Sequence, residues 1–196
     1  MPSLVIPRDA DVTMAGTNGG GWVAPLGTTK PASPLATPPG PWAALGRLTE
    51  DGLVRGFDED STEFRSWGQT SPFRTIITKS NRTFKVACQE INRPAVMSLW
   101  NRIPEGSLTP DGDGLINFAE TATPTPDRRA WWFVVLDGAT FRGFYIPQGE
   151  ISNREDETYK NDELAIYNMT ITAYPDDAGN TVYHTIKAAV VDSPSS

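Results

Sequence analysis

The segment from Ala130 to Leu136, AWWFVVL, constrains the fold more than any other part of this chain. Its aromatic and β-branched residues favour a β-strand. Because side chains alternate between the two faces of a strand, Trp131 and Trp132 point in opposite directions, and both faces are apolar. Such a strand needs cover on both sides. The core of a small β domain supplies one cover, and we expect a helix or a neighbouring subunit to supply the other.

Most of the other regular segments also have the composition of strands. Apolar and polar residues alternate strictly from Tyr167 to Tyr174, as in a half-buried strand. Less regular patterns predict strands at residues 43–48, 53–67, 73–79, 84–89, 141–146 and 182–188. Turns are predicted at residues 49–52, 137–139 and 175–180, and an edge or bulge at Pro147. The predicted fold class is mainly β, a β-sandwich or barrel of about eight strands flanked by one short α-helix.

Residues 71–100 are predicted to form a tight β-hairpin followed by that helix. The polar residues Ser80–Arg82 would make the turn of the hairpin. Asn92 is a suitable N-cap, with Pro94 in the first helical turn. An apolar stripe at helical spacing is expected to pack the helix onto the β core: Val96, Leu99 and Trp100.

Three consecutive carboxylates interrupt the strand pattern between residues 53 and 67. Asp58, Glu59 and Asp60 have apolar residues on both sides. The segment is either one long strand with a bulge in the middle or two strands joined by an exposed acidic turn, and both alternatives stay open. Unpaired buried charge is very costly, so we expect all three carboxylates to face solvent.

Residues 1–41 differ in composition from the rest of the chain. Many glycines and prolines leave little room for regular structure. The segment is either a disordered tail or an arm that becomes ordered on a neighbouring subunit. Trp22 and the cluster at residues 4–6 favour the arm, because a solvated linker needs no large apolar side chains. We therefore divide the chain into an extended N-terminal arm, residues 1–41, and a β domain, residues 42–196.

Composition argues against several classes of protein. The net charge of −7 and the pI of about 4.7 are unsuited to gripping nucleic acid, which needs clustered Lys and Arg. No apolar run approaches the roughly 18 residues that span a bilayer. The first residues lack the basic start, apolar stretch and cleavage site of a secretory signal. We expect an acidic, soluble protein that is made inside the cell and has no membrane partner.

The sequence contains little that could carry catalysis. His184, the single histidine, lies between apolar residues, and a core or interface position fits it better than the role of a base. Cys88 matches a small buried hydrophobe, and with one His and one Cys no four-ligand zinc site can form. Residues 111–114 resemble the start of a calcium loop but lack its later ligands, which favours a polar turn. We predict no catalytic residue, no cofactor and no metal.

Five segments follow one another in an order that resembles a known family. They are GRLTEDG, TIITKSNRTF followed by the helix, WWFVVLDG, GFYIPQGEI and IYNMTITAYPDDAG, within residues 42–183. This order resembles the major tail tube proteins of long-tailed, non-contractile (siphovirus-type) bacteriophages. The resemblance implies a structural virion protein without catalytic residues, with a β-sandwich or barrel flanked by a helix.

The resemblance also implies a mode of assembly. Such subunits form hexameric rings that stack into a hollow tail tube, through which double-stranded DNA passes into the bacterial host. The implied partners are other copies of the chain and other tail proteins, namely the tape measure, terminator and distal tail proteins. The implied location is the tail of the virion, with assembly in the host cytoplasm.

Two sets of residues are candidates for contacts in such an assembly. The apolar candidates for a subunit interface are Trp22, Trp131, Trp132 and His184. The acidic candidates, Asp58, Glu59 and Asp60, would either repel DNA in the lumen or lie between rings. Between rings they would need basic partners on a neighbour, such as Arg55, Arg65 or the pair at residues 128–129.

Other functions fit the sequence less well and remain alternatives. Another ring-forming phage protein, a tail terminator or connector, would form one ring rather than a polymer. A carbohydrate-binding module would be monomeric and have no ordered arm. A glycoside hydrolase would need two facing carboxylates in a deep cleft.

Overall fold

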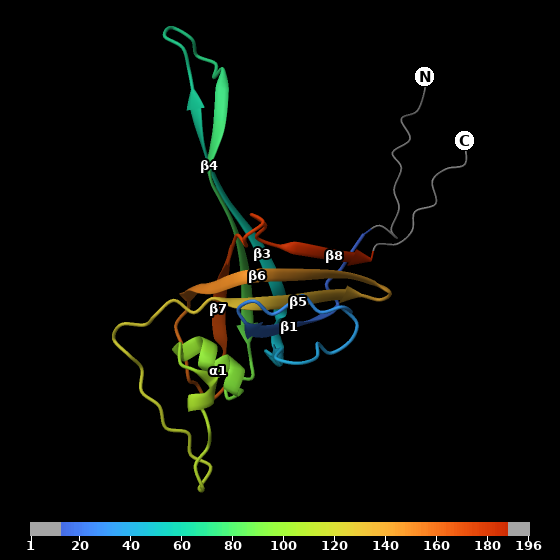
Figure 1. Ribbon diagram of the computed structural model, residues 1–196, viewed down its shortest axis with the longest axis vertical. Coiled ribbons are helices and arrows are strands. Elements are labelled where there is room, and N and C mark those ends of the chain that lie inside the picture. Colours follow the sequence, from blue (N-terminus) through green and yellow to red (C-terminus); the bar gives the residue numbers. More distant parts are fainter. Residues whose placement is uncertain (1–12, 188–196) are drawn as a thin grey trace, which may run out of the picture.

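The AWWFVVL segment forms strand β5 (Arg129–Asp137) near the middle of an eight-stranded sheet. The structure is a computed structural model and describes residues 13–187 (Figure 1). The other elements are β1 (Asn18–Pro25), β2 (Ala43–Ala44), β3 (Leu48–Phe64), β4 (Arg74–Cys88), α1 (Pro94–Asn101), the 3₁₀ turn η2 (Glu105–Ser107), β6 (Thr140–Arg154), β7 (Tyr167–Tyr174) and β8 (Tyr183–Lys187).

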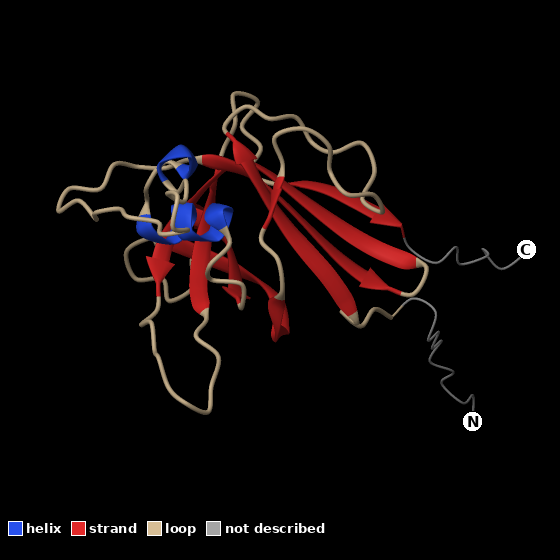
Figure 2. Ribbon diagram, turned by 90° about the horizontal axis from the view of Figure 1, so that it is seen from below, coloured by secondary structure: helices blue, strands red, loops and turns tan. Residues whose placement is uncertain are grey.

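All strand pairs are antiparallel, in the order β2-β1-β5-β6-β7-β4-β3. β8 pairs with β6 outside this order. The end strands β2 and β3 are not paired with each other, so the sheet does not close into a barrel. The predicted mainly β class with one short helix is confirmed (Figure 2). Among residues 13–187, no helix is long and apolar enough to cross a membrane.

Strand β6 joins two groups of strands because its two halves have different partners. Residues 141–145 lie between β5 and β8, whereas residues 148–154 pair with β7. The register with β5 shifts between the pairs Trp131–Ile146 and Arg129–Gly149. This irregularity surrounds Pro147, which lacks an N–H for a regular ladder, and the predicted bulge is therefore confirmed.

One face of β5 contributes to the main core. Trp131 and Phe133 are buried there against strands β4, β6 and β7. The Trp131 indole N–H donates to the carbonyl oxygen of Gly149 at 3.0 Å. A Cβ at Gly149 would lie 2.5 Å from the indole ring, so this close approach requires glycine. The apolar stripe of α1 lies in the same core, as predicted: Val96, Leu99 and Trp100.

The opposite face of β5 has a second, smaller core. Trp132 and Val134 pack there with Ala24 and Trp42, and Tyr145 lies at its edge. The Trp42 and Tyr145 rings meet edge to face, with centroids 6.3 Å apart. The second cover of the two-faced strand is therefore supplied by the chain itself, through the segment that leads into β2.

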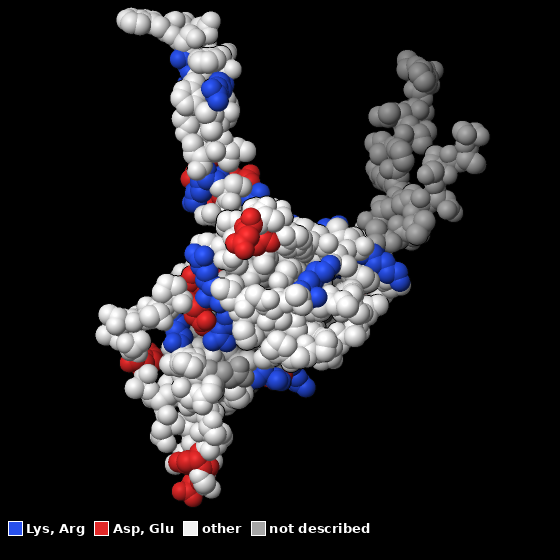
Figure 3. Space-filling model, viewed as in Figure 1, with Lys and Arg blue, Asp and Glu red and all other residues white. Residues whose placement is uncertain are grey.

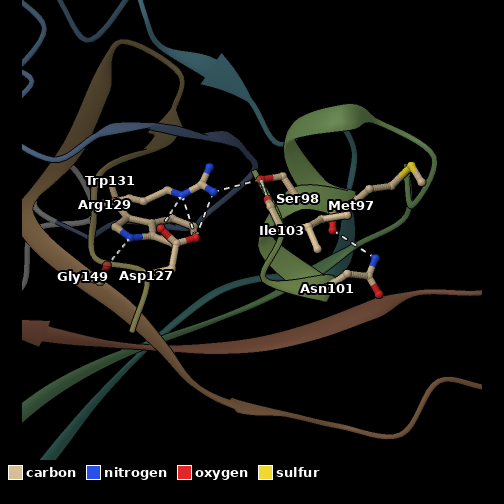
Figure 4. A network of polar contacts seen from close by, with 8 residues as sticks. All are labelled: Met97, Ser98, Asn101, Ile103, Asp127, Arg129, Trp131 and Gly149. Atoms are coloured by element: carbon tan, nitrogen blue, oxygen red, sulfur yellow. Dashed lines mark hydrogen bonds and ion pairs between the residues drawn. The ribbon is translucent and has the colours of Figure 1, made fainter. Parts of the chain in front are cut away.

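Helix α1 is held to the sheet by a polar network at its C-terminal end (Figure 4). The buried Ser98 hydroxyl donates to the carbonyl oxygen of Ile103 at 2.6 Å and accepts from Arg129 at 2.8 Å. Asp127 binds the same guanidinium through both carboxylate oxygens. The predicted N-cap is wrong by one residue, since Arg93 occupies that position, without a side-chain cap, directly before Pro94.

The predicted turn at Ser80–Arg82 is wrong. β4 runs without a break through these residues, and residues 65–73 connect it to β3. The acidic segment lies within β3, with a register shift after Asp60, so the bulged long strand is the correct alternative. The turn predicted at residues 49–52 is likewise an irregular part of β3, in which Gly52 has a φ of 63°.

The first strand lies inside the segment predicted as an arm. Residues 18–25 of β1 pair with β5 along their whole length. Trp22 is half-buried and packs against the smaller core. Residues 18–25 are therefore part of the sheet, while the cluster at residues 4–6 lies outside the described residues.

Candidate assembly surfaces

The outer halves of β3 and β4 extend away from the rest of the molecule as a two-stranded ribbon. We call residues 58–81 the ribbon; it forms the long projection in Figure 1. β7 pairs with β4 only from Arg82 to Cys88, and β3 pairs only with β4. Both outer edges of the ribbon therefore lack a strand partner within the described chain.

The distal half of the ribbon exposes large apolar side chains. Trp67 in the connecting loop is fully exposed, and the other exposed members are Phe64, Phe73, Ile76 and Ile77. An isolated two-stranded hairpin is at best marginally stable in water. Contiguous exposed apolar residues usually mark an interaction site. We call this distal half, residues 64–77, the ribbon tip. It is the strongest candidate for a docking surface.

The three acidic residues of β3 have basic partners within the chain. Lys79 Nζ lies 2.6 Å from Asp58 Oδ2 and 3.9 Å from Asp60 Oδ2. Glu59 accepts a hydrogen bond from the Ser80 hydroxyl and lies 2.8 Å from the Arg82 guanidinium, and these contacts, in that order, lower its pKa. The three carboxylates face solvent as expected, but much of their charge is balanced across the ribbon. Their role in the lumen or between rings stays a prediction.

A cluster of arginines occupies the base of the ribbon. Arg55 of β3 lies over the rings of Phe57, Phe84 and Phe144 at 4.5, 6.0 and 5.7 Å. Its Nε is buried without a hydrogen-bond partner in the described chain. Burial, and then the nearby charges of Arg82 and Arg142, lower the pKa of Arg55. We call Arg55, Arg82 and Arg142 the arginine cluster.

His184 is exposed on β8 beside this cluster. Its ring meets Phe144 edge to face, with centroids 5.3 Å apart. Burial of part of the ring, and then the charges of Arg55 and Arg142, lower the pKa of His184 below its usual value. The side chain is at the surface rather than in the core, and its predicted place in a subunit interface stays a prediction.

We expect the substitution Arg142→Ala to raise the pKa of His184, because it removes one of the two positive charges that oppose protonation of the imidazole. The chain has a single histidine, so its imidazole resonances in an NMR titration are unambiguous. Lys85→Ala, at an exposed residue of β4, is the matched control and should leave the titration unchanged. An equal pKa in wild type and Arg142→Ala would contradict the proximity of the two side chains.

The predicted interface tryptophans of β5 are covered within a single chain. Trp131 is 0% and Trp132 is 1% exposed. Their contact with a neighbouring subunit stays a prediction, but their burial already stabilises the subunit itself.

The ribbon tip was not predicted from the sequence. A signal was present, because Trp67 and Phe73 lie on either side of a polar stretch that contains a glycine.

The remaining polar candidates have structural roles. Cys88 is buried, and burial with the nearby Glu90 charge raises the pKa of its thiol to about 12. Asp111 accepts hydrogen bonds from the backbone N–H groups of Asp113 and Leu115, which makes the predicted polar turn. Within residues 13–187, no group of three or more His, Cys, Asp or Glu side chains could hold a metal ion.

Comparison with known proteins identifies the family of this chain. One solved structure that the search matches is titled cryo-EM structure of the anti-feeding prophage (AFP) baseplate, 6-fold symmetrised. That match has a TM-score of 0.46 and 8% identity over 93% of this chain and 97% of the other, and nothing below rests on it. No curated protein matches the sequence. A family model described as phage tail tube protein matches residues 7–195. The chain therefore belongs to the phage tail tube protein family.

Proposed function

We propose that this chain polymerises as stacked hexameric rings into the tail tube of a long-tailed, non-contractile phage. Family membership supports a structural component of the tail. The observation that carries the finer proposal is the ribbon, which exposes Trp67, Phe73 and Ile77 far from the body of its own chain. Nothing within residues 13–187 covers these side chains, and we propose that another copy of the chain does.

A ribbon that docks on a second copy makes a heterologous contact. The donor surface is the ribbon tip, and the receiving surface is a different part of the neighbouring copy. Heterologous contacts close into rings when the rotation permits and otherwise continue as filaments. A subunit with both kinds of contact, one around the ring and one along the axis, builds a tube. Closure at six subunits is part of the proposal.

The tube would conduct double-stranded DNA from the virion into the bacterial host. We place Asp58, Glu59 and Asp60 between rings rather than in the lumen, since Lys79 and Arg82 balance much of their charge and weaken repulsion of phosphate. The further proposed partners are tape measure, terminator and distal tail proteins, and the proposed site of assembly is the host cytoplasm.

Electron microscopy of the purified protein tests this function. The expected result is hollow tubes of uniform diameter, whose end views have six-fold symmetry. Single rings that do not stack would indicate a tail terminator or connector instead. If the purified protein alone stays monomeric at high concentration, self-assembly is contradicted.

A further inference from the structure

The arginine cluster carries positive charge that the described chain does not balance. Arg82 has a carboxylate partner, Glu59. Among residues 13–187, no carboxylate lies within ion-pair distance of Arg55 or Arg142. Arg142 is exposed on β6, where it faces β8, and Arg55 reaches from β3 toward the Phe144 ring of the same β6. The Arg142 charge acts on both Arg55 and His184, so the two unpaired guanidinium groups lie near each other, where β3, β6 and β8 meet.

Two further observations suit these groups to binding an anion. Burial first, and then the like charges of Arg82 and Arg142, lower the pKa of Arg55, so an anion at this place would relieve repulsion between the arginines. The buried Nε of Arg55 lacks an acceptor, and buried donors in native structures are nearly always paired. Carboxylate is the planar anion that a guanidinium binds best in proteins. The chain as a whole has a net charge of −7, so carboxylates are abundant on other copies.

One acidic element lies at the opposite end of the molecule. The loop at residues 108–128 extends beyond η2, away from the ribbon, and Figure 3 shows Asp and Glu side chains at its tip. Asp113 and Glu120 are exposed and have no ion-pair partner in the described part of the chain. The exposed Leu115 and Phe118 add apolar surface to the same loop. We call residues 108–128 the acidic loop.

We propose that the acidic loop of one copy binds the arginine cluster of the next copy along the tube, with Asp113 as the main carboxylate. This inference rests on the proposed function. The ribbon and the acidic loop project from opposite ends, so in a head-to-tail stack both enter the same seam. The ribbon then lies along the body of the next ring, while the acidic loop of that ring enters the angle at the ribbon base.

DNA phosphate is the other anion that an arginine cluster could bind. A carboxylate is favoured for two reasons. Arg55 is half-buried beside the Phe84 and Phe144 rings, so it is less open to a passing polyanion than a fully exposed basic side chain would be. The acidic loop also provides the complementary charge at the end of the molecule that a stacked copy would present.

Charge reversal at exposed positions tests the contact. Arg142→Glu and Asp113→Lys should each raise the protein concentration needed for tube formation by about tenfold or more, because like charges would face each other across the seam. The double variant should return close to the wild-type concentration, since the pair is restored with reversed signs. Lys85→Glu, which makes the same charge change at an exposed residue of β4, should assemble as wild type. Circular dichroism of each monomer checks the fold, and Arg142→Gln, with a smaller expected effect, replaces Arg142→Glu if that variant is unfolded.

The outcomes separate this inference from the proposed function. If wild type forms no tubes, both are wrong. If wild type forms tubes and the two single variants assemble equally well, the contact is wrong and the function stands. Normal assembly of Arg142→Glu with faster DNA passage, because a carboxylate replaces a phosphate-binding arginine, would place the cluster on the DNA path and overturn the carboxylate contact. If both single variants assemble poorly and the double variant is not rescued, a direct pair between Arg142 and Asp113 is likewise excluded.

Discussion

The double substitution Trp67→Ser with Phe73→Ser is expected to abolish tube formation at concentrations where wild type assembles, while the subunit stays folded. Both side chains are exposed in the single chain, so their loss removes little packing from the monomer. Burial of a large apolar side chain contributes about 1.5–3 kcal/mol. Two such losses in every ribbon contact correspond to a rise of about 10²- to 10⁴-fold in the concentration needed for assembly. Sedimentation with electron microscopy of the pellet measures it.

A matched control distinguishes the ribbon tip from exposed apolar surface in general. Leu164 and Leu35 are also strongly exposed, on loops outside the ribbon. The variant Leu164→Ser with Leu35→Ser should form tubes as wild type does. If the ribbon variant assembles at the wild-type concentration, the ribbon tip is not the docking surface, and the contact between rings must be sought elsewhere.

The sequence predicted those parts of the fold whose pattern is set by a core. β7 alternates strictly between buried and half-buried residues, as its sequence indicated. The stripe of α1 was likewise visible, because Val96, Leu99 and Trp100 all contact one core. Where one face of a helix or strand is buried, the spacing of apolar residues in the sequence matches the type of element in the structure.

The ribbon was mispredicted because neither of its faces belongs to a core. Ser80 and Asn81 have the composition of a turn, yet in β4 they lie opposite Glu59 and Asp58. A solvated strand tolerates polar residues on both faces, so hydrophobic period gives no signal there. Turn propensity then dominated the interpretation, and a strand of 15 residues was divided into two.

The candidate assembly surfaces were only partly predictable for a related reason. The arginine cluster combines β3, β4 and β6, which are far apart in sequence, so only the folded chain brings its members together. The second cover of β5 is also a long-range contact, since β2, β3, β4 and α1 separate Trp42 from Trp132 in the sequence. The sequence showed that cover was needed on both faces but not which molecule supplied it.

Trp131→Ala is expected to destabilise the subunit by about 3–5 kcal/mol, the usual cost of truncating a fully buried aromatic side chain. The indole is 0% exposed, stacks on Phe133 with centroids 6.1 Å apart and donates to the Gly149 carbonyl oxygen. Truncation leaves a cavity and removes a buried hydrogen bond, and both effects act in the same direction.

Urea unfolding of the monomer measures this change, and the ribbon-tip double variant is a suitable background because it is expected to stay unassembled. Phe73→Ser and Trp67→Ser together should change the stability by no more than about 0.5 kcal/mol, as is usual for exposed positions. A loss below about 1 kcal/mol for Trp131→Ala would show that the single chain does not bury the indole as described. The cover of this face of β5 would then have to come from a neighbouring subunit, which is one of the two covers that the sequence analysis expected for a strand with two apolar faces.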